Sequence, residues 1–144
     1  IVEKSPVVNF LFEKIVKFIK KNKGMMLVMD YGYVYNNNNN NNNNSSLQSI
    51  KDNKKTYFLN NVGKQDLTSL VNFDVLLDIL DKNNVKTNTI QSQRDFLIKN
   101  GINLRAEMLI KKNRELDKII TNQVSRLTDI DKMGSLFKFL IFDS

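Results

Sequence analysis

Apolar residues recur with a helical period at the start of the chain. Ser5 and Pro6 are typical of a helix N-terminus, and apolar side chains then return every three or four positions up to Ile19. Gly24 ends this predicted helix, and the unbroken apolar run Met25–Met29 follows it directly. Such a short run predicts a strand buried on both faces, as in a parallel sheet covered by helices. The order of helix, glycine and strand therefore indicates an α/β fold.

The same reasoning predicts further elements along the chain. Asn72 is the expected N-cap of a helix, and the core side of that helix would hold Phe73, Leu76, Leu77 and Leu80. Residues 66–71 are predicted to be a strand or an extended lead-in that presents Asp66 and Thr68 to one side. The remaining predictions are a strand at Val85–Ile90, a helix at Gln91–Lys99 capped by Ser92, helices at Ile102–Ile110 and Arg114–Leu127, and a strand at Phe137–Phe142.

One segment differs in kind from the rest of the chain. Asn36–Asn44 is a run of asparagine, and Ser45 and Ser46 extend it. A polar run of this kind cannot bury enough apolar surface to offset the entropy lost when it becomes ordered. We therefore expect residues 36–46 to form a disordered insertion within a single unit, residues 1–144.

The end of the first predicted strand carries candidate chemistry. Asp30, Tyr31 and Gly32 follow the apolar run directly. In open α/β sheets, ligands bind outside the carboxyl ends of the strands, so these residues would lie at the mouth of a site. An acid after a buried strand also commonly begins a turn, and composition alone does not separate the two interpretations.

The composition restricts the available chemistry. The 144 residues include no Cys and no His, which excludes disulfides, thiolate nucleophiles, an imidazole base and the usual zinc ligands. No apolar run approaches the length of a membrane span, and no secretory leader is recognisable. The chain does not begin with Met, so the sequence does not decide whether a transit peptide precedes residue 1.

The net charge of +7 is spread along the chain. Residues 1–35 carry 6 Lys or Arg against 3 acids, residues 45–90 carry 6 against 5, and residues 91–144 carry 10 against 7. Surfaces that bind nucleic acid usually cluster their cations. The pattern therefore favours solvated surface lysines and disfavours a nucleic-acid partner.

Short motifs occur in a specific order over nearly the whole chain. They are Val2-Glu3-Lys4-Ser5-Pro6, Gly24 with Asp30-Tyr31-Gly32-Tyr33, Ser46-Leu47-Gln48, Asn61-Val62-Gly63 with Asp66-Leu67-Thr68, Val71-Asn72-Phe73, Gln93 with Phe96-Leu97, Gly101-Ile102 with Arg105-Ala106, Arg126-Leu127-Thr128, and Met133-Gly134 with Leu136-Phe137-Lys138. In this order they resemble the C-terminal part of the MidA-like S-adenosylmethionine-dependent methyltransferases. Mitochondrial members of that family methylate an arginine on a complex I subunit during its assembly.

The resemblance implies a fold, a cofactor and a partner. The fold would be the C-terminal half of a class I, Rossmann-like methyltransferase sheet with added helices. S-adenosyl-L-methionine would be bound by a glycine-rich loop upstream of this chain, because the five glycines present here stand alone. We therefore expect no cofactor-binding and no metal-binding residues here. The partner would be a complex I subunit and the location mitochondrial, or cytoplasmic if the protein is bacterial.

Two functions are compatible with this resemblance. In the first, the chain is a fragment of a protein-arginine methyltransferase, inactive alone, in which Asp30, Tyr31, Asp66 and Thr68 are the catalytic candidates on the substrate side. Methyl transfer to a guanidinium nitrogen needs such polar groups to align the nucleophile and accept its charge. In the second, the chain is a truncated, non-catalytic interaction module that only docks the partner.

The chain departs from the family pattern at four positions. Family members often carry His, His, Asp and Pro where this chain has Asn53, Leu70, Asn72 and Val62. The amide of Asn72 keeps the shape of the acid but loses its charge, which lowers the expected activity. Gln93 and Arg105 are interpreted as structural residues that hold helices together, since buried polar groups usually satisfy their neighbours.

Overall fold

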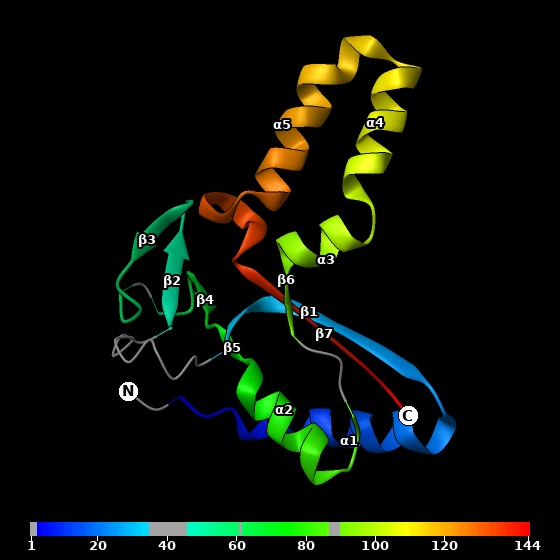
Figure 1. Cartoon of the computed structure of the whole chain (residues 1–144). Coiled ribbons are helices and arrows are strands. Elements are labelled where there is room, and N and C mark those ends of the chain that lie inside the picture. The colour runs from blue at the N-terminus through cyan, green and yellow to red at the C-terminus, as the bar shows by residue number, and fades with distance from the viewer. Residues whose placement is uncertain (1–2, 35–45, 61, 87–89) are drawn as a thin grey trace.

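The computed structural model describes residues 3–34, 46–60, 62–86 and 90–144, and it shows a mixed α/β fold (Figure 1). The helices are α1 (Pro6–Asn22), α2 (Phe73–Lys82), α3 (Gln93–Lys99), α4 (Ile102–Lys112) and α5 (Asp117–Thr128), with a 3-10 turn at Arg114–Leu116 and a π-type turn at Ile130–Gly134. The strands are β1 (Met25–Tyr33), β2 (Gln48–Lys51), β3 (Lys54–Thr56), β4 (Asp66–Thr68), β5 (Val71–Asn72), β6 (Gln91–Ser92) and β7 (Phe137–Asp143). The predicted fold class is confirmed.

The main sheet has four strands in the order β5-β1-β7-β6. β1 and β7 pair antiparallel over seven residue pairs, and β6 pairs antiparallel with the other edge of β7. β5 pairs parallel with β1, but only at Gly32 and Tyr33. The predicted C-terminal strand is confirmed, and it lies inside the sheet.

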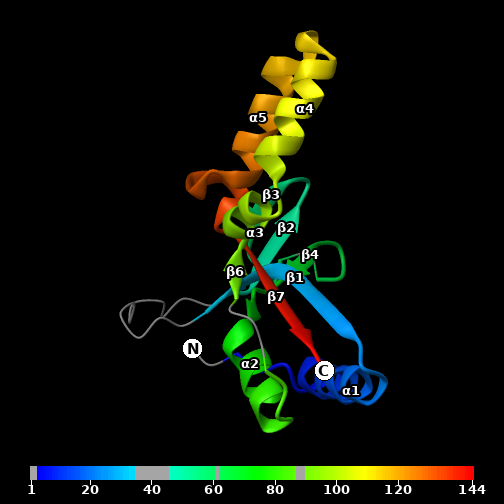
Figure 2. The same cartoon turned by 45° about the vertical axis from the view of Figure 1, so that its right-hand side comes forward.

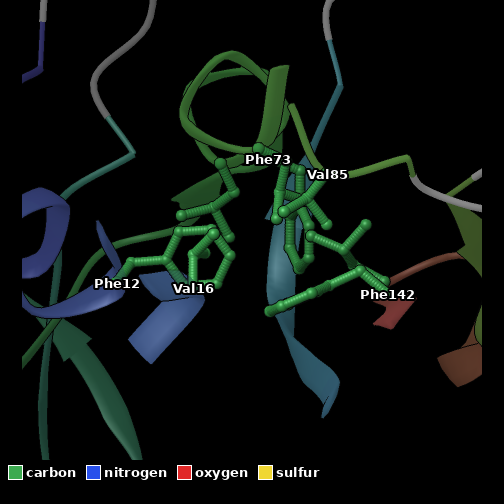
Figure 3. Close-up of a cluster of buried hydrophobic side chains, with 8 residues drawn as sticks. Phe12, Val16, Phe73, Val85 and Phe142 are labelled. Carbon is green, nitrogen blue, oxygen red and sulfur yellow. The ribbon is translucent and has the colours of Figure 1, made fainter. Parts of the chain in front are cut away.

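One apolar core fills the space between this sheet and helices α1 and α2 (Figure 3). Phe12 and Val16 from α1 meet Phe73 from α2 and Phe142 from β7 in the core. The rings of Phe12 and Phe142 make an edge-to-face contact with their centroids 5.7 Å apart. The helices predicted around these residues are confirmed, although Val8 and Leu11 of the apolar stripe that predicted α1 are exposed.

The two faces of β1 differ. Met26 and Val28 pack against the core, whereas Met25, Leu27 and Met29 on the opposite face are exposed, Met25 by 70%. The prediction of a strand buried on both faces is therefore wrong. The physical reason is that α1 and α2 pack on the same face of the sheet. The first seven residues of β1 also have no strand partner on the β5 side in the described part of the chain.

A second, smaller sheet consists of β2, β3 and β4 in the order β3-β2-β4, all antiparallel. The predicted lead-in at residues 66–71 therefore divides between two sheets, with β4 in the small one and β5 beginning in the main one. Residues 36–45 of the predicted insertion lie outside the described residues. Ser46, its last residue, is described, and its N–H and hydroxyl donate to the Glu3 carboxylate.

The predicted strand at Val85–Ile90 is wrong in its described residues. The N–H of Val85 donates to Leu80 O at 3.0 Å, so this residue closes the end of α2 instead of joining a strand. Its side chain is buried in the core, which accounts for the apolar position. Residues 87–89 lie outside the described residues, and the strand β6 begins only at Gln91.

Helices α4 and α5 form an antiparallel hairpin that projects from the sheet on the side away from α1 and α2 (Figures 1 and 2). Both predicted helices are confirmed. Buried Gln93 joins α3 to α5, because its Nε2 donates to Leu127 O at 2.8 Å, as a structural role requires. Arg105 is exposed on α4, so the structural interpretation is wrong for this residue.

Candidate functional site

A cavity of about 440 Å³ lies at the carboxyl ends of the parallel strands β1 and β5. Tyr33 and Asn72, the last residues of these strands, line it together with the first turns of α1 and α2. We call it the strand-end cavity, and its lining residues are Glu3, Lys4, Ser5, Val8, Asn9, Tyr33, Leu47, Ser69, Leu70, Val71, Asn72, Val75 and Leu76. Open α/β sheets bind ligands at this position, which makes it the candidate site.

A carboxylate in the wall of the cavity is held by a distant part of the chain. Glu3 Oε1 accepts the N–H of Ser46 at 2.7 Å, and Glu3 Oε2 accepts the Ser46 hydroxyl at 2.5 Å. Ser46 Oγ in turn accepts the N–H of Leu70 at 3.1 Å. Three separate segments are therefore joined at the cavity, and the half-buried carboxylate is fixed by two hydrogen bonds.

Two helices begin at the cavity, and they are capped differently. Asn72 Oδ1 accepts the N–H of Asp74 at 3.0 Å, which confirms the predicted N-cap of α2. Ser5 occupies the N-cap position of α1, but its side chain makes no capping hydrogen bond. Pro6 at the start of α1 lacks an N–H, so one of the groups that a cap would serve is absent there.

Asp30 and Tyr31 lie on β1 and point to opposite faces of the sheet, since side chains alternate along a strand. Asp30 Oδ1 accepts the N–H of Tyr31 at 2.7 Å, and Asp30 is opposite Lys138 in the register. The Tyr31 ring contacts Phe137 with the ring centroids 3.9 Å apart. Neither residue lines the strand-end cavity.

Asp66 and Thr68 lie on β4 in the small sheet, opposite Ile50 and Gln48 of β2. Both side chains are exposed. Asp66 lines a shallow polar pocket with Lys51 and other residues of the β2–β3 turn. The four predicted site residues are thus divided between two sheets, and none of the described cavities holds all of them.

Two ionisable groups toward the C-terminus, Asp129 and Lys138, have lowered pKa values. Burial lowers the pKa of the Lys138 ammonium, whose Nζ donates to Ser135 O at 2.5 Å and forms no ion pair with Asp30. The pKa of Asp129 is lowered, first by its hydrogen bond from Ser125 and then by the one from Lys132. These groups lie away from the strand-end cavity, so its electrostatics depend on Glu3 and the exposed Lys4.

Sequence reasoning missed Glu3, Tyr33 and Asn72 as lining residues of one cavity. The sequence predicts Asn72 as a helix cap and as the position of an acid in the family pattern, and Glu3 only as part of a motif. Their positions could have indicated the cavity, because all three residues lie near a predicted helix start or strand end. The pairing of β1 with β5, which brings them together, is only two residues long and leaves no pattern in the sequence.

Residues 1–91 match a protein family described as "Putative S-adenosyl-L-methionine-dependent methyltransferase". This match covers more than half of the chain. The chain belongs to this methyltransferase family. No curated protein matches it.

Two crystal structures from Burkholderia thailandensis resemble the chain over 98% of its length, each at 18% sequence identity. One is an uncharacterized protein with a TM-score of 0.82, and the chain covers 38% of it. The other, with a TM-score of 0.80, is bound to S-adenosyl-homocysteine, and the chain covers 36% of it. The chain therefore spans less than two fifths of either protein, and the likeness shows that it shares their α/β fold.

Four of the five glycines of this methyltransferase-family chain have a packing or turn role. A Cβ at Gly32 would lie 2.4 Å from Phe73 Cε2, and one at Gly134 would lie 2.4 Å from Thr128 O. Both positions are filled by the chain's own atoms. Gly63 and Gly101 have positive φ angles in turns with open space around them.

Metal-binding clusters and membrane-spanning helices are two further properties of the described residues that bear on function. No cluster of three or more Asp or Glu side chains in the described ranges is placed to hold a metal ion. No described helix has the length and apolar character needed to cross a membrane.

Proposed function

We propose that this chain supplies the acceptor side of an S-adenosyl-L-methionine-dependent protein-arginine methyltransferase. The family match over residues 1–91 is the observation that carries the proposal. The arginine acceptor, the complex I subunit that bears it and the mitochondrial location rest on the ordered motifs that resemble the MidA-like family. A bacterial source would make the location cytoplasmic.

The cofactor would be held by a part of the enzyme outside these 144 residues. The S-adenosyl-homocysteine-bound relative is more than twice as long as the region that this chain covers, and the glycines here are used for packing and turns. The unpaired edge of β1 and its exposed face are the surface on which we place that part. A further strand on this edge would extend the sheet, and helices packed on its open face would bury Met25, Leu27 and Met29.

This chain's own contribution would be to bind and orient the acceptor. A carboxylate that accepts N–H bonds from a guanidinium positions the nucleophilic nitrogen and stabilises its charge. Asp30 and Asp66, with Tyr31 and Thr68, stay candidates for this role on the substrate side. These four residues are exposed and lie on two sheets, whereas the strand-end cavity is a single site. Variants of the four residues and variants of the cavity lining therefore test the two possible acceptor sites separately.

The complete reading frame tests the proposal. The coding sequence ahead of residue 1 would be cloned with this chain, and the protein incubated with methyl-labelled S-adenosyl-L-methionine and isolated complex I subunits. We expect label on an arginine of one subunit, identified by mass spectrometry. Label on another residue type would overturn the arginine acceptor, and absence of transfer from a folded protein that binds the cofactor would overturn the enzyme.

A second candidate is a non-catalytic module that only docks the partner, and like the enzyme it is compatible with a chain that covers 36% of the S-adenosyl-homocysteine-bound relative. An in-frame stop codon directly ahead of this chain would support the module, and a strand with a glycine-rich loop there would support the enzyme. Titration of the 144-residue chain with S-adenosyl-L-methionine is the matched control. Micromolar binding would show that the cofactor site lies within this chain and not outside it.

A further inference from the structure

Helix α1 has an exposed apolar row in addition to the one that faces the core. Val7, Leu11 and Phe18 are 77%, 56% and 64% exposed, although each is a large apolar side chain. They lie on the opposite side of α1 from the buried Phe12 and Val16. Exposed apolar groups that form one continuous patch mark interaction surfaces, whereas isolated ones do not.

The spacing of this row is that of two paired helices. Val7, Leu11, Lys14, Phe18 and Lys21 are separated alternately by four and three residues, and we call these five positions the α1 seam. Such a row follows one side of a helix and packs against a matching row on a neighbouring helix. The seam is about 21 Å long, since each residue adds about 1.5 Å along a helix. A helix that lies on a bilayer buries a whole apolar face, so a row this narrow favours a helical partner.

The charges of α1 define the chemistry of that partner. The helix contains four lysines and one acid, Glu13. Glu13 accepts from Lys17 at 2.6 Å and lines a cavity between α1 and α2, so its charge is already matched. The Lys14 ammonium lies 4.3 Å from the centroid of the Phe10 ring, which keeps this charge at the surface beside the seam. Acidic side chains on the partner would therefore complement Lys14 and Lys21.

A second copy of the chain does not match this surface. Pairing two α1 seams in either direction would bring the seam lysines of both copies together, with no acid in either row. The exposed face of β1, on which we place the rest of the enzyme, is on the other side of the sheet from α1. The α1 seam is therefore a separate surface, and α1 lies at the periphery in both views of the chain (Figures 1 and 2).

We propose that the α1 seam docks an acidic amphipathic helix of a partner protein. The apolar row of that helix covers Val7, Leu11 and Phe18, and its acids pair with Lys14 and Lys21. This adds an interaction surface to the chain that does not depend on the identity of the methyl acceptor.

Titration with designed helical peptides tests the proposal. The isotope-labelled chain carries Met25→Thr, Leu27→Thr and Met29→Thr, which remove the apolar face of β1 as a competing site. The probes are a stapled peptide with leucines at heptad spacing flanked by glutamates, its analogue with lysines in place of the glutamates, and a scrambled analogue of the acidic peptide. We expect saturating NMR shift changes at Leu11 and Phe18 with the acidic peptide, and at least about tenfold weaker binding of both analogues. Equal binding of the acidic and scrambled peptides, or shifts confined to other helices, would overturn the proposal.

Apolar variants assign the binding to the seam. Leu11→Gln with Phe18→Gln should weaken binding of the acidic peptide by about tenfold or more. Leu104→Gln with Met108→Gln, the matched change at two exposed positions of α4, should leave binding unchanged. Because all four side chains are exposed, these variants should retain the fold. Equal binding by the two double variants would overturn the seam as the docking site.

Charge reversal tests the seam lysines separately. Lys14→Glu with Lys21→Glu should reverse the preference, so that the lysine peptide binds more tightly than the acidic one. Lys111→Glu with Lys112→Glu, the same change on exposed α4, is the matched control and should leave the preference for the acidic peptide. An unchanged preference in the seam variant would overturn the charge pairing.

Other occupants of the seam give distinct results, and each would overturn the partner helix. Binding to phosphatidylserine vesicles that Phe18→Gln abolishes would identify a bilayer. Self-association of the triple Thr variant in sedimentation velocity, abolished by the same Phe18→Gln change, would identify a second copy. Loss of peptide binding in the complete protein, which includes the coding sequence ahead of residue 1, would show that another part of the same polypeptide covers the seam. Methyl transfer by the complete protein is measured separately and does not decide between these occupants.

Discussion

Gly32 and Phe73 are in contact so close that no other residue type fits at position 32. A Cβ there would lie 2.4 Å from Phe73 Cε2 and 2.5 Å from Val71 O. The contact joins the parallel end of β1 to the first residue of α2, and both elements border the strand-end cavity. The glycine of the Asp30-Tyr31-Gly32 sequence therefore serves packing beneath the candidate site.

Gly32→Ala should destabilise the chain by about 3 kcal/mol, the upper end of the cost of overpacking, because a fully buried ring and a backbone oxygen both obstruct the new methyl group. Urea unfolding followed by circular dichroism measures the change. Gly24→Ala is the matched control, since its Cβ would lie 3.4 Å from the flexible end of Ile19. It should change the free energy of unfolding by less than about 0.5 kcal/mol. Similar effects of both variants would contradict the close contact.

Leu80→Ala and Leu104→Ala remove the same atoms from two very different environments. Leu80 is fully buried in the core, whereas Leu104 is 63% exposed on α4. The buried substitution should cost about 2–5 kcal/mol through lost burial and a cavity, and the exposed one no more than about 0.5 kcal/mol. The free energies of unfolding in urea give the comparison. A large loss for Leu104→Ala would mean that the α4–α5 hairpin is buried in solution.

Asn72→Ala should destabilise the chain by about 1 kcal/mol, because it removes the acceptor for the N–H of Asp74 at the start of α2. Ser5→Ala, at the equivalent position of α1, should be nearly neutral, since the Ser5 side chain makes no capping bond. Asn72→Asp restores the acid common in the family and should retain stability. Thermal melts of the three variants test this, and equal losses for Asn72→Ala and Ser5→Ala would contradict the assigned caps.

The lowered pKa of Asp129 predicts a pH dependence at the end of α5. Because the folded pKa lies below the ordinary value of 3.8, the stabilisation is present above that value and is lost as the pH falls through the folded pKa. Ser125→Ala removes the largest cause and should raise the pKa of Asp129, as followed by the carboxyl carbon shift in NMR titrations. Glu13, whose pKa is lowered by Lys17, should keep its value and serves as the internal control.

The open face of β1 predicts self-association of the isolated chain. Met25, Leu27 and Met29 are exposed beside an unpaired strand edge, a combination that promotes edge pairing and aggregation. Replacing all three with Thr keeps strand propensity and should shift the chain toward monomer in sedimentation velocity. Val28→Thr, on the core side of the same strand, should instead lower stability without reducing association. A concentration-independent monomer of the unaltered chain would contradict the prediction.

The sequence predicted helices and strands best where an apolar face with a regular period packs into the hydrophobic core. The helices around Phe12 and Phe73 and the strand around Phe142 followed from apolar spacing, because these residues pack together in one core. Apolar spacing did not predict that Met25–Met29 would be covered on one face only. The sequence pattern of a strand is the same whether or not another element packs on its second face. The apolar signal of Val85 came from burial after a helix and not from a strand.

The candidate site was less predictable, because it depends on contacts between segments far apart in sequence. Glu3 and Ser46 are 43 residues apart, and the asparagine run separates them. Asp30 and Tyr31 were expected to follow the end of the strand, but β1 continues to Tyr33. Both residues therefore lie within the strand, and the cavity lies beyond them.

The position of β7 between β1 and β6 has a consequence for biosynthesis. Leu140 and Phe142, which complete the core, are among the last residues that the ribosome adds to these 144. Until they emerge, β1 and the helices packed on it lack the neighbour that β7 provides, so a nascent chain that has not reached β7 exposes apolar surface. A ribosome that stalls before residue 137 would release a product that chaperones and proteases recognise as unfolded.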